Sequence, residues 1–157
     1  MDEVIRDVMT REVECARPDM TLREVARIMK DQNLGSLPVC EGTSIAGMIT
    51  DRDITVRGVA EGRDPAATKV SEVMSREVVT VKEDSRLDEA ERLMHDRQLR
   101  RLPVVNDKGE MTGFLSLAKV ARTEGSEQIG RVIKGVSQPS TPAPMHSFEK
   151  KKRRKAQ

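Results

Sequence analysis

The residues best placed to do chemistry in this sequence are Thr50 and Asp53, within the segment "GMITDRDI". A β-prone run ends at Thr50 and a helix is expected to begin there, so unpaired backbone N–H groups and the helix dipole favour a bound anion. A carboxylate three residues later lies one helical turn on, where it can accept hydrogen bonds from both hydroxyls of a vicinal diol. The helix start therefore favours an anion, and the carboxylate offers acceptors for ligand hydroxyls.

The same spacing also has a purely structural interpretation. A Ser or Thr followed three residues later by an acidic residue is typical of a helix capping box, in which the two residues exchange hydrogen bonds. Arg52, which lies between them, either reaches a phosphate or lies on a solvated face of the helix. Both interpretations of Thr50, Arg52 and Asp53 stay open from the sequence.

A later segment, "GFLSLAKV", repeats the pattern with one reversal of charge. Ser116 keeps the hydroxyl, but Lys119 stands where the first segment has Asp53. An ammonium group only donates hydrogen bonds, so it cannot accept them from a diol, and near a helix N-terminus it is mildly unfavourable. Either this second site has lost its function, which we favour, or Lys119 with Arg100 and Arg101 binds phosphate that arrives in another way.

These two segments end the halves of an internal repeat. The 32 residues from Val8 align without a gap with the 32 residues from Val73, and 15 of the 32 pairs are identical. One inserted residue then aligns Gly47 with Gly113. The repeat predicts two structural units of about 50 residues each, joined by the polar stretch "AEGRDPAATKVSE".

Each unit has the same expected order of elements: strand, helix, strand, strand, helix. Short β-prone runs open the units at 13–16 and 78–81, and "LPVC" with "IAGMIT", like "RLPVV" with "EMTGFLS", predicts a β-hairpin. We therefore expect an α/β (α+β) fold of two tandem β-α-β-β-α units. A three-stranded sheet covered by helices on one face leaves apolar surface on the other, so the units should bury that surface against each other.

The first helix of each unit has a sequence signature for its start. Thr21 with Glu24, and Ser85 with Asp88, predict capping boxes. Apolar residues follow at helical spacing in both units, so each helix has one apolar face.

Composition narrows the class of protein. The chain has 157 residues, 34% of them charged, and a mean hydropathy of −0.56, and no window approaches the run of about 20 apolar residues that spans a membrane. The N-terminus does not resemble a signal peptide, so we expect a cytoplasmic location. Cys15 and Cys40 are expected to be reduced, and they could pair only if the fold brings them close.

The positive charge of the chain is concentrated at its C-terminal end. The net charge is +2, but residues 150–155, "KKKRRK", leave 22 basic against 26 acidic residues in the rest. We predict a short helix at 125–137, packed on the module or on a second chain, and a disordered tail at 138–157. The basic run could contact nucleic acid, an acidic partner or an anionic membrane surface, or have no specific partner.

The motifs resemble a tandem pair of cystathionine-β-synthase (CBS) domains, the Bateman module. The matching motifs are "VMT" and "VMS" at the unit starts, "LGSLPV" and "LRRLPV" before the hairpins, and "GMITDRDI". The resemblance covers residues 1–124, with the first unit at 1–62 and the second at 63–124. It implies a pseudo-twofold pair with two clefts between the units, where adenosine nucleotides often bind, and modules that commonly dimerise.

The resemblance also implies roles for individual residues. Thr50 would contact phosphate, Asp53 would accept both ribose hydroxyls, and the adenine would lie between the first hairpin strand and the opening strand of the second unit. The residues implied there are Ser36, Leu37, Pro38, Val39, Glu77, Val79 and Thr80.

We therefore predict a non-enzymatic regulatory module that senses AMP, ADP or ATP, requires no cofactor, forms a homodimer and signals to an unknown effector protein. The apolar stripes Ile54 with Val56 and Leu117 with Val120 would face the dimer partner. The alternative is a dimeric scaffold with empty clefts, whose basic tail does the binding. No nucleophile–base pair is discernible, and His95 and His146 lack neighbours at metal-ligand spacing.

Overall fold

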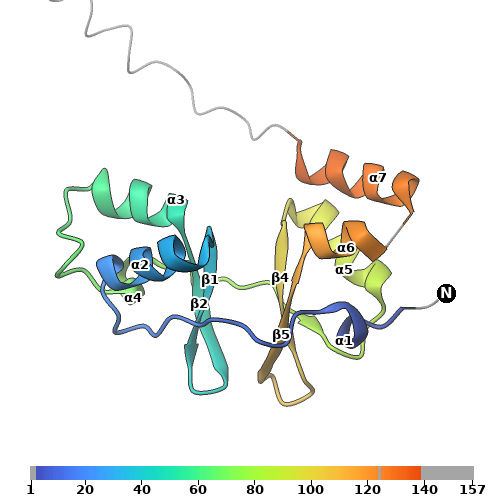
Figure 1. Cartoon of the computed structure of the whole chain (residues 1–157), viewed down its shortest axis with the longest axis horizontal. Helices are drawn as coiled ribbons and strands as arrows, with labels where there is room; N and C mark the ends of the chain where they lie inside the picture. Colours follow the sequence, from blue (N-terminus) through green and yellow to red (C-terminus); the bar gives the residue numbers. More distant parts are fainter. Residues whose placement is uncertain (1–2, 124, 139–157) are drawn as a thin grey trace, which may run out of the picture.

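The structure is a computed structural model that describes residues 3–123 and 125–138. Figure 1 shows two similar units side by side, with the two β-hairpins at the centre and the helices outside. The fold is mixed helix and strand, and the two units are related by an approximate twofold axis. His146, the basic run at 150–155 and nearly all of the expected tail lie outside the described residues.

The first unit is built on one antiparallel hairpin. Strands β1 and β2 pair from Ser36 with Thr50 to Glu41 with Ser44, with one irregularity between Val39 and Cys40. Its elements are α2 (Leu22–Gln32), β1 (Ser36–Glu41), β2 (Ser44–Thr50), α3 (Asp51–Asp53), the π-helix η1 (Ile54–Val59) and α4 (Val70–Val73).

The second unit repeats this plan and adds a C-terminal helix. Its sheet has the order β3-β4-β5, with β3 parallel and β5 antiparallel to β4. Its elements are β3 (Val81–Lys82), α5 (Leu87–Arg97), β4 (Arg101–Val105), β5 (Met111–Ser116), α6 (Leu117–Thr123) and α7 (Ser126–Val136).

The predicted capping box at the start of α2 is confirmed, and the one at the start of α5 is wrong. Thr21 and Glu24 exchange both hydrogen bonds. Helix α5 begins at Leu87, so its cap position is occupied by Arg86, whose side chain makes no capping bond. Ser85 is therefore one residue too early to cap the helix.

The strands predicted to open the units are much shorter than expected. In the first unit the run 13–16 contributes only a single parallel bridge between Ala16 and Val39, and in the second the run 78–81 contributes only its last residue, Val81, to β3. The reason is that both runs cross from one unit to the other. Thr10 still pairs with Phe114 of the second unit, and only six residues later Ala16 pairs with Val39 of the first. Most of each run therefore connects the two sheets.

Each unit is completed by a helix that precedes the other unit in sequence. Helix α1 (Ile5–Val8) packs into the hydrophobic core of the second unit, and α4 packs into that of the first. Figure 1 shows α1 beside β5 although it begins the described chain. The expected boundary between residues 62 and 63 separates the repeats along the sequence. In the structure, the helix that begins each repeat packs into the core of the other unit.

Helix α7 packs only on the second unit. Ile129, Val132 and Val136 are buried against the core that contains α5 and α6, while Ile133, at the edge of the same apolar face, is 45% exposed. In the part of the chain that the structure describes, every helix is too short or too polar to cross a lipid bilayer.

Candidate functional site

A cleft of about 770 Å³ lies between the two units, and we call it the first cleft. One wall is the end of the first hairpin and the start of α3, including Ser36, Thr50 and Arg52. The opposite wall belongs to the second unit and comprises the connector 77–79 and the chain from Gln98 to Arg101. The volume is within the range of about 300–1,000 Å³ typical of small-molecule sites.

The helix start at this cleft is a closed capping box. Thr50 Oγ1 accepts a hydrogen bond from the backbone N–H of Asp53 (3.0 Å), and Asp53 Oδ2 accepts one from the backbone N–H of Thr50 (3.0 Å). The capping interpretation of these two residues is therefore confirmed. It leaves a ligand role untested, because a carboxylate has about four acceptor positions and this bond uses one.

Three arginines line the first cleft from two sides. Arg52 follows the helix start of the first unit, while Arg100 and Arg101 come from the second unit. From the sequence, Arg100 and Arg101 were grouped with Lys119 at the second site. Arg100 in fact lines the first cleft and does not line the second, and Arg101 lines both.

The other residues implied by the resemblance are divided between cleft and core. Ser36, Glu77 and Val79 line the first cleft. Leu37 and Val39 are buried in the first core, with 1% and 0% of their surfaces exposed. Leu37 and Pro38 contribute to the wall of the second cleft, whereas Asp53, Val39 and Thr80 line neither cleft.

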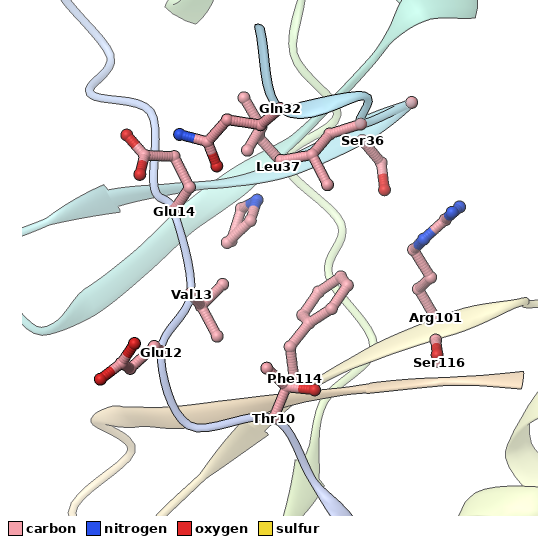
Figure 2. Close-up of a pocket in the computed structure, with 13 residues that line it drawn as sticks. Thr10, Glu12, Val13, Glu14, Gln32, Ser36, Leu37, Arg101, Phe114 and Ser116 are labelled. Carbon is pink, nitrogen blue, oxygen red and sulfur yellow. The ribbon is translucent and has the colours of Figure 1, made fainter. Parts of the chain in front are cut away.

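The second cleft, about 320 Å³ in volume, lies on the other side of the hairpin pair. In Figure 2 the Phe114 ring and the Arg101 side chain extend from β5 and β4 toward Ser36 and Leu37 of β1. Its remaining wall is the N-terminal connector, residues 12–14. This cleft is thus smaller, and it pairs one arginine with two carboxylates, those of Glu12 and Glu14.

The helix start beside the second cleft is only half closed. Ser116 Oγ accepts a hydrogen bond from the backbone N–H of Lys119 (3.1 Å). The reciprocal bond cannot form, because the lysine side chain has no acceptor. Lys119 lines neither cleft, whereas Ser116 lines the second cleft and also a groove between α6 and α7.

The sequence-based reasoning missed residues 12–14 and Phe114 in the second cleft and Asp51 in the first. The repeat contained a signal for the connector, because residues 77–79 occupy the positions equivalent to 12–14. Because Glu77 and Val79 were expected to line one cleft, their equivalents Glu12 and Glu14 could have been expected to line the other.

The two cysteines, which the sequence left unplaced, lie together. Cys40 Sγ is 3.3 Å from Cys15 Sγ, and both thiols are free. Among the described residues, no group of three or more His, Cys, Asp or Glu side chains could hold a metal ion. His95 is half exposed on α5, and its Nδ1 lies 2.9 Å from Asp96 Oδ1.

One half of the expected dimer stripe is wrong. Val120 is fully buried in the core of its own unit and cannot face a partner, whereas Leu117, like Ile54 in the first unit, is only partly buried against its own core. In the first unit Val56 is 47% exposed and Val59 is 66% exposed. Exposed apolar side chains therefore remain on η1, and Ile133 of α7 is a third.

Comparison with known proteins agrees with this architecture. The family model described as "CBS domain" matches residues 5–57 and 70–124, that is, both units. The chain is 40% identical over 134 residues to the CBS domain-containing protein YhcV of Bacillus subtilis strain 168, covering 85% of this chain and 94% of the relative.

Two solved structures show the same arrangement. Hypoxic Response Protein I, determined with two coordinated zinc ions, is 31% identical, with a TM-score of 0.71 over 78% of this chain and 99% of the other. The CBS domain pair of protein MJ0100, in complex with 5′-methylthioadenosine and S-adenosyl-L-methionine, is 25% identical, with a TM-score of 0.68 over 78% of this chain and 100% of the other. With two matched units and relatives aligned over nearly their whole length, this chain belongs to the CBS-domain family, whose paired domains are regulatory ligand-binding modules.

Proposed function

We propose that this chain is a non-enzymatic regulatory module that binds an adenosine nucleotide, of the AMP, ADP or ATP class, in the first cleft. The observation that carries the proposal is the composition of that cleft: a helix start at Thr50 faces Arg100 and Arg101 across a space large enough for a nucleotide. The MJ0100 pair, with its two adenosine ligands, supports the choice of nucleoside.

The phosphate end of the ligand belongs beside the arginines. Arg52, Arg100 and Arg101 line the first cleft around the helix start, and guanidinium groups bind phosphate oxygens through paired hydrogen bonds. A single phosphate cannot contact three guanidinium groups on opposite walls as well as a longer chain can. The cleft is therefore expected to prefer ATP or ADP over AMP.

The nucleoside end belongs beside the first hairpin. Ser36 Oγ is buried at the cleft wall and, among the described residues, has no hydrogen-bond partner. A buried hydroxyl without a partner costs about 1–3 kcal/mol, which a ligand group would recover. Asp53 remains the proposed diol acceptor, and Asp51, which lines the cleft, is the matched carboxylate to compare with it.

Binding would report on the relative position of the two units. Every ligand in the first cleft touches walls from both units, so it stabilises the arrangement in which those walls are correctly spaced. Both clefts are lined by two carboxylates, but the first has three arginines and the second has one, so the second cleft is expected to stay empty of nucleotide. We therefore expect each chain to bind one nucleotide.

The test is calorimetric titration of the full chain with ATP, AMP, adenosine and tripolyphosphate. The expected result is one ATP bound per chain, with ATP binding more tightly than AMP and AMP more tightly than adenosine. At about 100 times Kd, ATP should raise the free energy of unfolding by about 2.7 kcal/mol. Tripolyphosphate binding as tightly as ATP would argue for a simple anion site, and two equal ATP sites would contradict the assignment of one working cleft.

The predicted homodimer remains a proposal, with η1 as its contact surface. Val56 and Val59 are the apolar residues that a partner copy would cover. Sedimentation at micromolar concentration should show a dimer, and Val59→Asp should shift it toward monomer. A wild-type chain that sediments only at 17.5 kDa would contradict the dimer.

A further inference from the structure

The two cysteines are brought together by backbone pairing. The Ala16 N–H donates to the Pro38 carbonyl (2.9 Å), and the Cys40 N–H donates to the Ala16 carbonyl (2.8 Å). Neighbouring side chains along extended chain point to opposite faces. Ala16 and Val39 enter the first core, so Cys15 and Cys40 share the other face, and their contact is fixed by the ladder.

The two thiols have different chemistry. Cys40, only 7% exposed, donates a hydrogen bond to the sulfur of Cys15, which is partly exposed. This hydrogen bond lowers the pKa of Cys15 to about 7, although burial and the nearby Glu14 oppose the shift. The same hydrogen bond, together with burial, raises the pKa of Cys40. Cys15 is therefore the thiol of the pair that ionises more readily, beside a protonated Cys40.

The surroundings favour redox chemistry over metal binding. The next sulfur is Met111 Sδ of the second unit, 3.9 Å from Cys40 Sγ. Protein zinc sites normally use three or four His, Cys or carboxylate ligands. Among the described residues, no third such side chain joins this pair.

We infer that Cys15 and Cys40 form a redox-sensitive dithiol that closes into an intrachain disulfide when a hydroperoxide reaches Cys15. The Cys15 thiolate attacks one peroxide oxygen, the O–O bond breaks, and the hydroxide released takes a proton to give water. The resulting sulfenic acid is then attacked by the Cys40 sulfur; the S–S bond forms, the S–O bond breaks, and the departing oxygen leaves as water with the Cys40 proton. Two thiols lose two electrons, and hydrogen peroxide becomes two molecules of water.

The disulfide would act on the seam between the units. Cys15 directly follows the connector residues 12–14, which form a wall of the second cleft, and Cys40 contacts Met111 across the seam. Closing the bond ties the connector to β1. Oxidation therefore restricts the segment through which the chain crosses between its two sheets.

The test is oxidation of the reduced full chain by hydrogen peroxide, followed by intact mass and thiol titration. Because these are the only two cysteines, the expected result is loss of both thiols together and loss of two hydrogens in mass, without added oxygen. The product should be a monomer on non-reducing gels and should return to the dithiol with dithiothreitol. The rate should rise with pH through a midpoint of about 7 as the Cys15 thiolate forms. Retained thiols, disulfide-linked chains or accumulated sulfinic acid would overturn the inference.

Two variants assign the roles. Cys40→Ser should leave sulfenic acid at Cys15, and Cys15→Ser should slow oxidation of the buried Cys40 by about tenfold or more relative to wild-type Cys15. The second variant alters the more exposed position and is less able to disturb folding. Cys40 reacting in Cys15→Ser as fast as wild-type Cys15 would contradict the assignment. Stoichiometric Zn²⁺ binding that protects both wild-type thiols would replace the dithiol with a metal site.

Discussion

The helix starts that follow β2 and β5 have the same backbone role and opposite side-chain charge. Thr50 and Asp53 exchange two hydrogen bonds, whereas Ser116 and Lys119 make only one of the two. The shared hydroxyl is sufficient to begin the helix in both units. The residue three positions later is therefore free to differ, and in one unit it supplies a carboxylate where the other supplies a cation.

The two clefts differ in charge because each takes one wall from the other unit. Arg100 and Arg101 occupy the positions equivalent to Gly35 and Ser36, so only the second unit presents arginines at this edge, and both line the first cleft. The N-terminal connector brings Glu12 and Glu14 to the second cleft. A nearly symmetric backbone thus carries an asymmetric pair of clefts, with three arginines lining the first and one lining the second.

The largest effect on stability is expected at the two glycines where a hairpin strand contacts the segment that crosses from the other unit. A Cβ on Gly47 would lie 2.5 Å from the backbone oxygen of Ser75, while one on Gly113 would first meet the flexible Met9 sulfur, at 2.5 Å, and then the Thr10 carbonyl, at 2.9 Å. Gly47→Ala should therefore lower the free energy of unfolding by about 2–3 kcal/mol, and Gly113→Ala by less. Chemical denaturation measures both.

Gly130→Ala is the control for this pair. It lies in α7 with no atom near a new Cβ, so alanine there should raise stability by up to about 1 kcal/mol. A larger loss in Gly113→Ala than in Gly47→Ala would show that the two hairpins are not seated in the way their contacts indicate.

Asp53→Ala tests whether the closed cap also serves a ligand. Loss of the capping carboxylate should lower stability by about 1 kcal/mol. If Asp53 accepts the ribose diol, ATP affinity should also fall at least about tenfold, because hydrogen bonds to a charged group contribute about 1.5–3 kcal/mol. Thermal unfolding and calorimetric titration separate the two effects.

Asp51→Ala is the matched control for Asp53. Its carboxylate accepts a bond only from the adjacent Arg52 backbone (2.8 Å) among the hydrogen bonds found, and it takes no part in the cap. It should change stability little, and because Asp51 lines the cleft, a larger loss of ATP affinity in Asp51→Ala than in Asp53→Ala would make Asp51 the ligand carboxylate. Reduced stability with unchanged ATP affinity in Asp53→Ala would assign Asp53 to capping alone.

Arg100→Ala tests the charge difference between the clefts. The residue is exposed, so its contact with phosphate should be screened, and its loss should weaken ATP about fivefold, equivalent to roughly 1 kcal/mol. AMP should be affected less than ATP. Arg23→Ala, which removes an exposed arginine of α2 that lines neither the first nor the second cleft, is the control for lost charge, and equal effects of both variants would remove Arg100 from the site.

Much of this arrangement could be predicted from the repeat, and the features that could not be predicted were missed for physical reasons. Apolar spacing identified the faces of α2 and α5 and of the hairpins, because burial imposes those periods. It could not show that α1 and α4 complete the neighbouring unit's core, since a period does not specify which sheet covers a face. For the same reason the sequence could not show that Arg100, which lies beside Ser116 in the groove between α6 and α7, also lines the first cleft, and it left the contact between Cys15 and Cys40 open.

The smallest expected effect is the most direct test of the two helix starts. Lys119→Asp would place a carboxylate where Asp53 stands in the first unit, so the backbone N–H of Ser116 would gain an acceptor and the helix dipole a favourable charge. Stability should rise by about 0.5 kcal/mol. Lys119→Ala is the control, because it removes the unfavourable cation without supplying the acceptor, and its stability should rise less.

If the aspartate variant were no more stable than the alanine variant, then the reciprocal bond would contribute nothing at this helix start. The closed cap at Thr50 would in that case owe its carboxylate to something other than stability, which would strengthen the ligand role of Asp53.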